Sequence, residues 1–115
     1  MGLDLSLYFE IPTAKGEEHY RVFARHISHS ARTVAIDCSD TLYNAIWHPY
    51  NLFDEPTAKQ LIPLLKIGLE ALNSTPMSPT ADVERARNYT ALVNLLREYV
   101  AACEYYPEAK VSAGN

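Results

Sequence analysis

The N-terminal residues alternate between apolar and polar or amphipathic side chains, and this pattern restricts the fold more than any other feature of the chain. The alternating residues are Leu3, Leu5 and Leu7 against Asp4, Ser6 and Tyr8. Because successive side chains of a strand point to opposite faces of a sheet, a period of two predicts a half-buried β-strand. Residues 19–27 alternate again after a turn at residues 13–18. The sequence therefore predicts an antiparallel hairpin over residues 1–27, which needs a further layer to be stable.

From residue 28 onward the apolar spacing becomes that of short helices. Ser28 is a suitable N-cap for a helix through residues 31–38. Ser39 can cap a second short helix, which we expect to end before Pro49 because the residue preceding a proline avoids the helical region. Two short helices are therefore expected directly after the hairpin.

Two longer helices are expected after the loop that follows. The first extends to Leu72, and Pro63 within it indicates either a start near Ile62 or a kink. The second covers residues 81–105, and residues 110–113 could add a third strand beside the hairpin.

These elements predict a single α+β domain over residues 1–115. The N-terminal hairpin and a short strand within residues 107–115 would form a small antiparallel sheet, covered on one face by about four helices from residues 28–106. The predicted core contains Leu5, Leu7, Val22, Val34, Ile46, Trp47, Leu61, Leu65, Leu69, Leu92, Leu96 and Val100.

Composition excludes several classes of partner. The formal net charge is −4 and the chain has no run of lysine or arginine, which argues against nucleic-acid binding. No apolar run is long enough to cross a bilayer, so no membrane partner is expected. The two cysteines are far apart and form no metal-binding or redox motif, which favours a reducing, cytoplasmic location.

Histidines gather in one stretch of the sequence and raise the question of a metal site. His26 and His29 are three residues apart and would share a face of a helix, and His48 could supply a third ligand. The expected strand end and the Ser28 cap separate His26 from His29, however. We therefore predict no metal site and place His48 at a helix C-terminus, where an imidazole suits the helix dipole. A small metal-binding module or metal-dependent enzyme that uses these three histidines is kept as an alternative.

Other reactive side chains fit structural roles better than catalytic ones. Cys38 and Cys103 both fall on apolar helical stripes, where a cysteine behaves as a small core residue. The glycines are isolated, so no phosphate-binding loop is present. No catalytic residue and no cofactor are predicted, and a non-enzymatic protein is favoured.

Exposed aromatic residues favour binding of another protein. Tyrosine and tryptophan are enriched at interfaces because they bury a large area with little loss of rotamer freedom. The predicted interaction residues lie at loops or helix ends: His48, Tyr50, Phe53, Tyr105 and Tyr106. For the last two, an equally weighted alternative is that they only cover the sheet.

Several segments, in this order, resemble a known family. They are His26–Ser30, Leu42–Pro49 (LYNAIWHP), Leu61–Leu72 (LIPLLKIGLEAL) and Tyr89–Ser112. The second and third fit the patterns L-Y-x-A-L/I-W-x-P and L-I-P-x-L-x-x-G-L. Over about residues 3 to 112 the chain is similar to a family of small uncharacterised proteins encoded by bacteriophages, prophages and some bacteria.

The chain departs from the family pattern at three places. His26 stands where the family has asparagine, and His48 stands where it has arginine. The glycine expected between the two short helices is missing, and Cys38-Ser39 occupies that region. These departures leave the role of the histidines open.

The resemblance implies a setting rather than a reaction. It predicts a phage or mobile-element accessory protein in the host cytoplasm that binds a host or phage protein, with inhibition of a defence factor such as a CRISPR system as one form of that activity. A homo-oligomeric virion or replication-associated protein, including a homodimer, is a further alternative.

Overall fold

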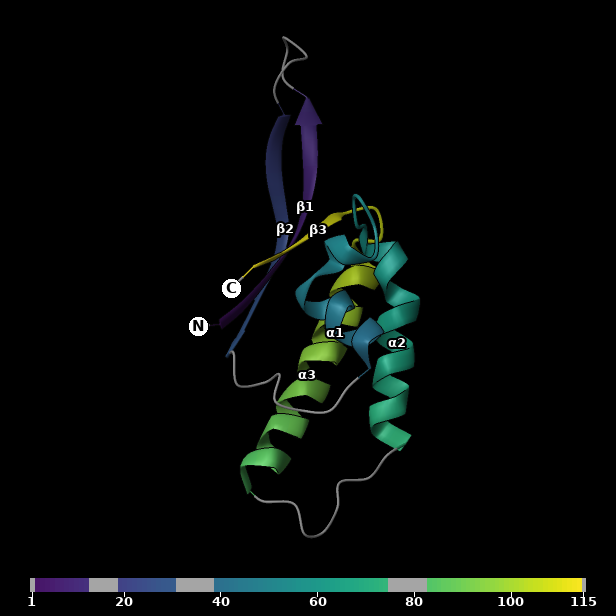
Figure 1. Ribbon diagram of the computed structural model, residues 1–115. Helices are drawn as coiled ribbons and strands as arrows, with labels where there is room; N and C mark the ends of the chain where they lie inside the picture. Colours follow the sequence, from purple (N-terminus) through teal and green to yellow (C-terminus); the bar gives the residue numbers. More distant parts are fainter. Residues whose placement is uncertain (1, 13–18, 31–38, 75–82, 115) are drawn as a thin grey trace.

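The sheet has three antiparallel strands with the N-terminal strand at its centre. The computed structural model describes residues 2–12, 19–30, 39–74 and 83–114. Strand β1 (Gly2–Pro12) pairs on one side with β2 (His19–Ser30) and on the other with β3 (Lys110–Gly114), in the order β2-β1-β3 (Figure 1). The predicted hairpin and the predicted C-terminal strand are both confirmed.

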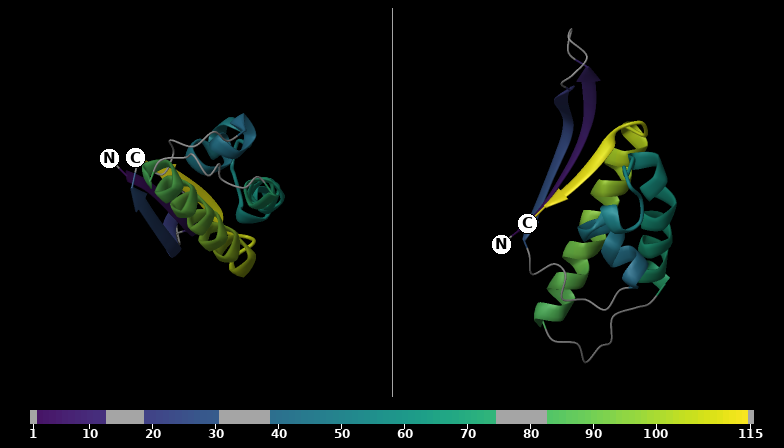
Figure 2. Two further views of the ribbon diagram at one scale, coloured as in Figure 1. Left: turned by 90° about the horizontal axis from the view of Figure 1, so that it is seen from below. Right: turned by 45° about the horizontal axis from the view of Figure 1, so that its top comes forward.

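Three α-helices lie within the described residues, one fewer than the four that the sequence suggested. They are α1 (Asp40–Trp47), α2 (Ala58–Ser74) and α3 (Val83–Tyr105), and a 3-10 turn, η2 (Pro49–Asn51), follows α1. Helix α3 lies against one face of the sheet, and α2 packs beside α3 (Figure 2). The α+β class is confirmed.

The difference in helix number arises where β2 ends. Ser28 was expected to cap a helix, but Ser28 and His29 both belong to β2, which continues to Ser30. Continued pairing with Asp4, Leu3 and Gly2 gives this segment backbone partners along its whole length, whereas a cap would satisfy one N–H group. The remainder of the expected helix, residues 31–38, lies outside the described residues, as do Val34 and Cys38.

A β-bulge in β2 changes which residues face the helices. Leu7 pairs with Arg25 but the next residue, Tyr8, pairs with Phe23, so Ala24 is the extra residue. Cross-strand partners share a face, so Val22 lies on the same face as Phe9 and the leucines, and Phe23 lies with Tyr8 on the outer face. Without the bulge, Phe23 would lie on the same face as Arg25 and Ile27.

Local signals in the helical part act as the sequence predicted. The Ser39 hydroxyl accepts a hydrogen bond from the Leu42 N–H at 3.2 Å, which caps α1, and the helix ends before Pro49. Helix α2 begins at Ala58 and contains Pro63, so the alternative in which the helix starts near Ile62 is wrong. The Ala58 N–H donates to the Ala109 carbonyl at 2.8 Å and so attaches the start of α2 to the residue before β3.

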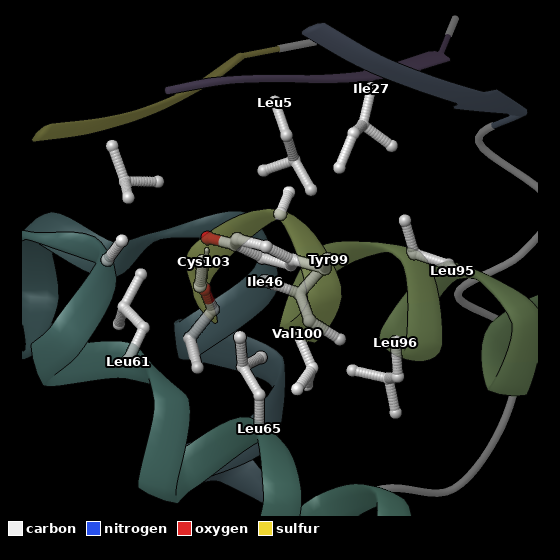
Figure 3. Close-up of a cluster of buried hydrophobic side chains, with 14 of the residues drawn as sticks. Leu5, Ile27, Ile46, Leu61, Leu65, Leu95, Leu96, Tyr99, Val100 and Cys103 are labelled. Carbon is white, nitrogen blue, oxygen red and sulfur yellow. Dashed lines mark hydrogen bonds between the residues drawn. The ribbon is translucent and has the colours of Figure 1, made fainter. Parts of the chain in front are cut away.

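The core lies between the sheet and the helices, centred on α3. Leu5 and Ile27 point from the sheet toward Leu95 and Tyr99 (Figure 3). The Tyr99 hydroxyl donates to the Ala45 carbonyl at 3.4 Å, which links α3 to α1 within the apolar interior. Tyr99 is missing from the list of predicted core residues, although it lies three residues after Leu96 and four before Cys103, a spacing that places it on the same side of the helix.

Most of the predicted core is confirmed. The fully buried members are Leu5, Leu7, Ile46, Leu61, Leu65, Leu92, Leu96 and Val100. Trp47 and Leu69 are only partly buried, against the edge of the core. The prediction that Val22 is a core residue is wrong. Val22 is 47% exposed, because the hairpin of β1 and β2 extends past the helical layer (Figure 1).

Two substitutions in α2 test this packing. We expect Leu65→Ala to lower the free energy of unfolding by about 2–5 kcal/mol, because it opens a cavity where the side chain is completely buried. Ile67→Ala on the same helix removes a side chain that is 66% exposed and should change stability by no more than about 0.5 kcal/mol. Urea denaturation of both variants measures the difference, and equal effects would contradict the orientation of α2.

Candidate functional site

His26 forms a small polar cluster with two side chains of β1 on the outer face of the sheet. The Ser6 hydroxyl lies 3.0 Å from His26 Nδ1, and His26 Nε2 lies 3.5 Å from a carboxylate oxygen of Asp4. Ser6 is directly opposite His26 in the strand register, and Asp4 is two residues along the same face. The sequence analysis missed this cluster, although the alternation in β1 already placed Asp4 and Ser6 on one face.

This cluster has the residue types of a hydrolase triad but not the arrangement. In such triads the carboxylate holds Nδ1 of the histidine and the serine faces Nε2; here the two nitrogens are exchanged. The side chains of His26 and Asp4 are 58% and 51% exposed, and an ion pair open to water fixes an imidazole only weakly. The geometry therefore describes a surface hydrogen-bond cluster.

Two of the three histidines considered as metal ligands, His26 and His48, have separate local partners. His26 is held by Ser6 and Asp4, whereas His48 caps the C-terminus of α1, where its N–H donates to the Asn44 carbonyl at 2.9 Å. The prediction for His48 as a helix terminus is thus confirmed. His29 pairs with Leu3 through its backbone. Within the described ranges, no group of three or more His, Cys, Asp or Glu side chains could hold a metal ion.

Cys103 is a core residue. It is fully buried on α3, and this burial raises the pKa of its thiol to about 12. A cysteine nucleophile requires a lowered pKa, so Cys103 has the opposite environment. Its placement on the buried stripe of the last helix is confirmed.

A hairpin arm exposes several large apolar side chains. We define it as residues 9–12 of β1 and 19–23 of β2, beyond the point where β3 pairs with β1. It projects past the ends of the helices (Figures 1 and 2). Large apolar side chains are exposed along it: Ile11, Tyr20, Val22 and Phe23. None of them was among the predicted interaction residues. Alternation along a strand predicts a buried face, but it does not show at which residue the covering helices end.

Aromatic side chains extend the surface from the arm to the end of α3. The Phe9 ring is 6.3 Å from that of Tyr106, which is 4.7 Å from that of Tyr105. Tyr106 is partly buried against the core and covers the sheet, whereas Tyr105 is 77% exposed. Tyr106 therefore fits the alternative in which it covers the sheet, and the interaction role of Tyr105 stays a prediction.

The other predicted interaction residues lie around α1 and η2. Tyr50 and His48 are exposed, and Phe53 is partly buried against the core. Tyr43, also exposed, stacks on Trp47 with ring centroids 6.3 Å apart and lies 5.8 Å from His48. Tyr43, Trp47 and His48 therefore form one group of ring contacts on and directly after α1.

Charged groups fix the base of the arm. Lys110 on β3 reaches Glu10 at 3.1 Å and Glu55 at 3.8 Å, and its hydrogen bond to Glu10 raises its pKa. The Arg21 guanidinium lies 4.6 Å from the centre of the Tyr8 ring, a cation–π contact on the outer face. Burial raises the pKa of Tyr8 and outweighs the opposite influence of Arg21.

Comparisons with known proteins leave the surface itself as the main guide to function. No protein-family model, no curated protein and no solved structure matches the chain. Among the described helices, none is both long and apolar enough to cross a membrane.

The buried thiol gives a simple chemical test. In a Cys38→Ser background, we expect Cys103 of the folded protein to remain unmodified by a disulfide reagent near neutral pH, because its raised pKa keeps it protonated and burial blocks access. Denaturant should make it react fully. Rapid modification of the folded protein would contradict the position of Cys103 in the core.

The His26 cluster can be tested for nucleophilic chemistry. A fluorophosphonate probe should not label the protein, because a solvated carboxylate cannot hold the imidazole in a productive position. Labelling that is lost on Ser6→Ala, with folding unchanged by circular dichroism, would show instead that this serine is activated.

Proposed function

We propose that this chain is a non-enzymatic binding protein, an accessory protein of a phage or mobile element that docks onto another protein in the host cytoplasm. The resemblance to phage-encoded proteins supports the setting. A host defence factor such as a CRISPR system is the class of partner that this setting favours.

The observation that carries the proposal is the hairpin arm. Tyr20 is 67% exposed and Val22 47% exposed, on the face of the sheet that carries the buried residues Leu3, Leu5, Leu7 and Ile27 nearer the helices. Burying such side chains on a partner gains about 25 cal/mol for each Å² of apolar surface removed from water. Exposed apolar side chains gathered on one projecting element are typical of protein-binding surfaces.

Capture from bacterial lysate tests the proposal. The immobilised full chain should retain at least one specific protein, and the double variant Tyr20→Ser/Val22→Ser should retain it at least about tenfold less, because it removes about 1.4 kcal/mol or more of binding energy. Ile67→Ser is the matched control, since it removes an equally exposed apolar side chain from α2.

Two results would contradict the proposal. One is the absence of any protein that distinguishes the double variant from the Ile67→Ser control. The other is a hydrolytic activity of the purified protein that depends on Ser6 or His26. Circular dichroism and size-exclusion chromatography of each variant would show that the fold is intact.

A further inference from the structure

Strand β2 lies at an edge of the sheet and is long for that position. It spans His19–Ser30, and β1 is its only neighbour among the described strands. Every second residue of such a strand directs its N–H and C=O groups away from the sheet, where they can pair with another chain. Native proteins commonly shorten or cover edges of this kind.

The bulge at Ala24 divides this edge into two parts with different surroundings. Beyond the bulge, Arg25 donates to Glu98 of α3 at 2.6 Å and His26 is engaged by the side chains of β1. Within the arm, Tyr20 and Val22 are exposed on one face and Phe23 on the other. Apolar contacts are therefore available on both faces of the edge in the part between His19 and Phe23.

The charge of β2 indicates the chemistry of a partner. Its twelve residues include two arginines and three histidines but no aspartate or glutamate, although the whole chain is acidic. Arg21 is exposed beside Phe23, and the Tyr8 ring holds its guanidinium on the outer face. Glu10 of β1 lies opposite Arg21 in the register and also contacts Lys110. A carboxylate on a strand added at the open edge could approach Arg21 from the other side at cross-strand distance.

We propose that the edge of β2 from His19 to Phe23 binds an extended segment of another protein as an additional antiparallel strand. This inference rests on the proposed binding function and specifies its partner. The segment carries apolar side chains that cover Tyr20 and Val22, and an acidic side chain that pairs with Arg21. Backbone hydrogen bonds supply affinity, and the side chains supply selectivity.

A second copy of the chain is a poorer occupant of the same edge. Two β2 strands side by side would bring a segment without any carboxylate against its own copy. Like charges directly opposite each other on neighbouring strands are destabilising. An acidic segment of a different protein avoids this repulsion.

Two synthetic peptides of about seven residues test the inference. One alternates valine with glutamate, and the control alternates valine with lysine. The full chain should bind the acidic peptide at least about tenfold more tightly, as measured by fluorescence anisotropy. Arg21→Gln should remove this preference and Arg21→Glu should reverse it. Lys66→Glu makes the same change of charge on α2 and should leave the preference unchanged.

Hydrogen exchange distinguishes an added strand from other modes of binding. The acidic peptide should slow exchange at outward-facing amides of residues 19–23. Equal binding of both peptides, or protection confined to the helices, would overturn the inference. If neither peptide binds but the captured protein still requires Tyr20 and Val22, the strand addition is wrong while the binding function stands. A dimer in light scattering that Arg21→Glu disrupts would overturn the inference in favour of self-association.

Discussion

Burial of one face of β1 against α3 is the contact on which the rest of the structure depends. Leu3, Leu5 and Leu7 are each almost completely buried, in one cluster with Tyr99 and Leu95 of α3, and Leu5 points toward these two residues (Figure 3). Among the described strands, β1 is also the one that pairs with both others. Loss of this contact would therefore separate the sheet from the helices and remove the support for both outer strands.

Features set by local chemistry could be predicted from the sequence. The leucine alternation predicted β1 and its buried face, and Ser39 predicted the start of α1. Each depends on neighbouring residues: a strand exposes alternate side chains to one face, and a cap satisfies a donor three residues away. Leu61 and Leu65 were recognised as core residues for the same reason.

Features set by distant parts of the chain could not be predicted. The end of β2 depends on how far β1 extends beside it, so Ser28 became a strand residue despite its suitability as a cap. The exposure of Val22 depends on where the helices stop, and the bulge at Ala24 leaves no distinctive mark in the sequence. The predicted site residues were chosen as aromatics at loops and helix ends, which overlooked the arm.

The position of β3 beside β1 has a consequence for the order of folding. The Lys110–Glu10 contact joins residues 100 positions apart, so the sheet cannot be completed until residues 110–114 have been synthesised. Until then β1 has an open side as well as its pairing with β2, and open strand edges favour aggregation. The helices, whose contacts are closer in sequence, can pack first. A strand only five residues long is therefore what closes the open side of β1.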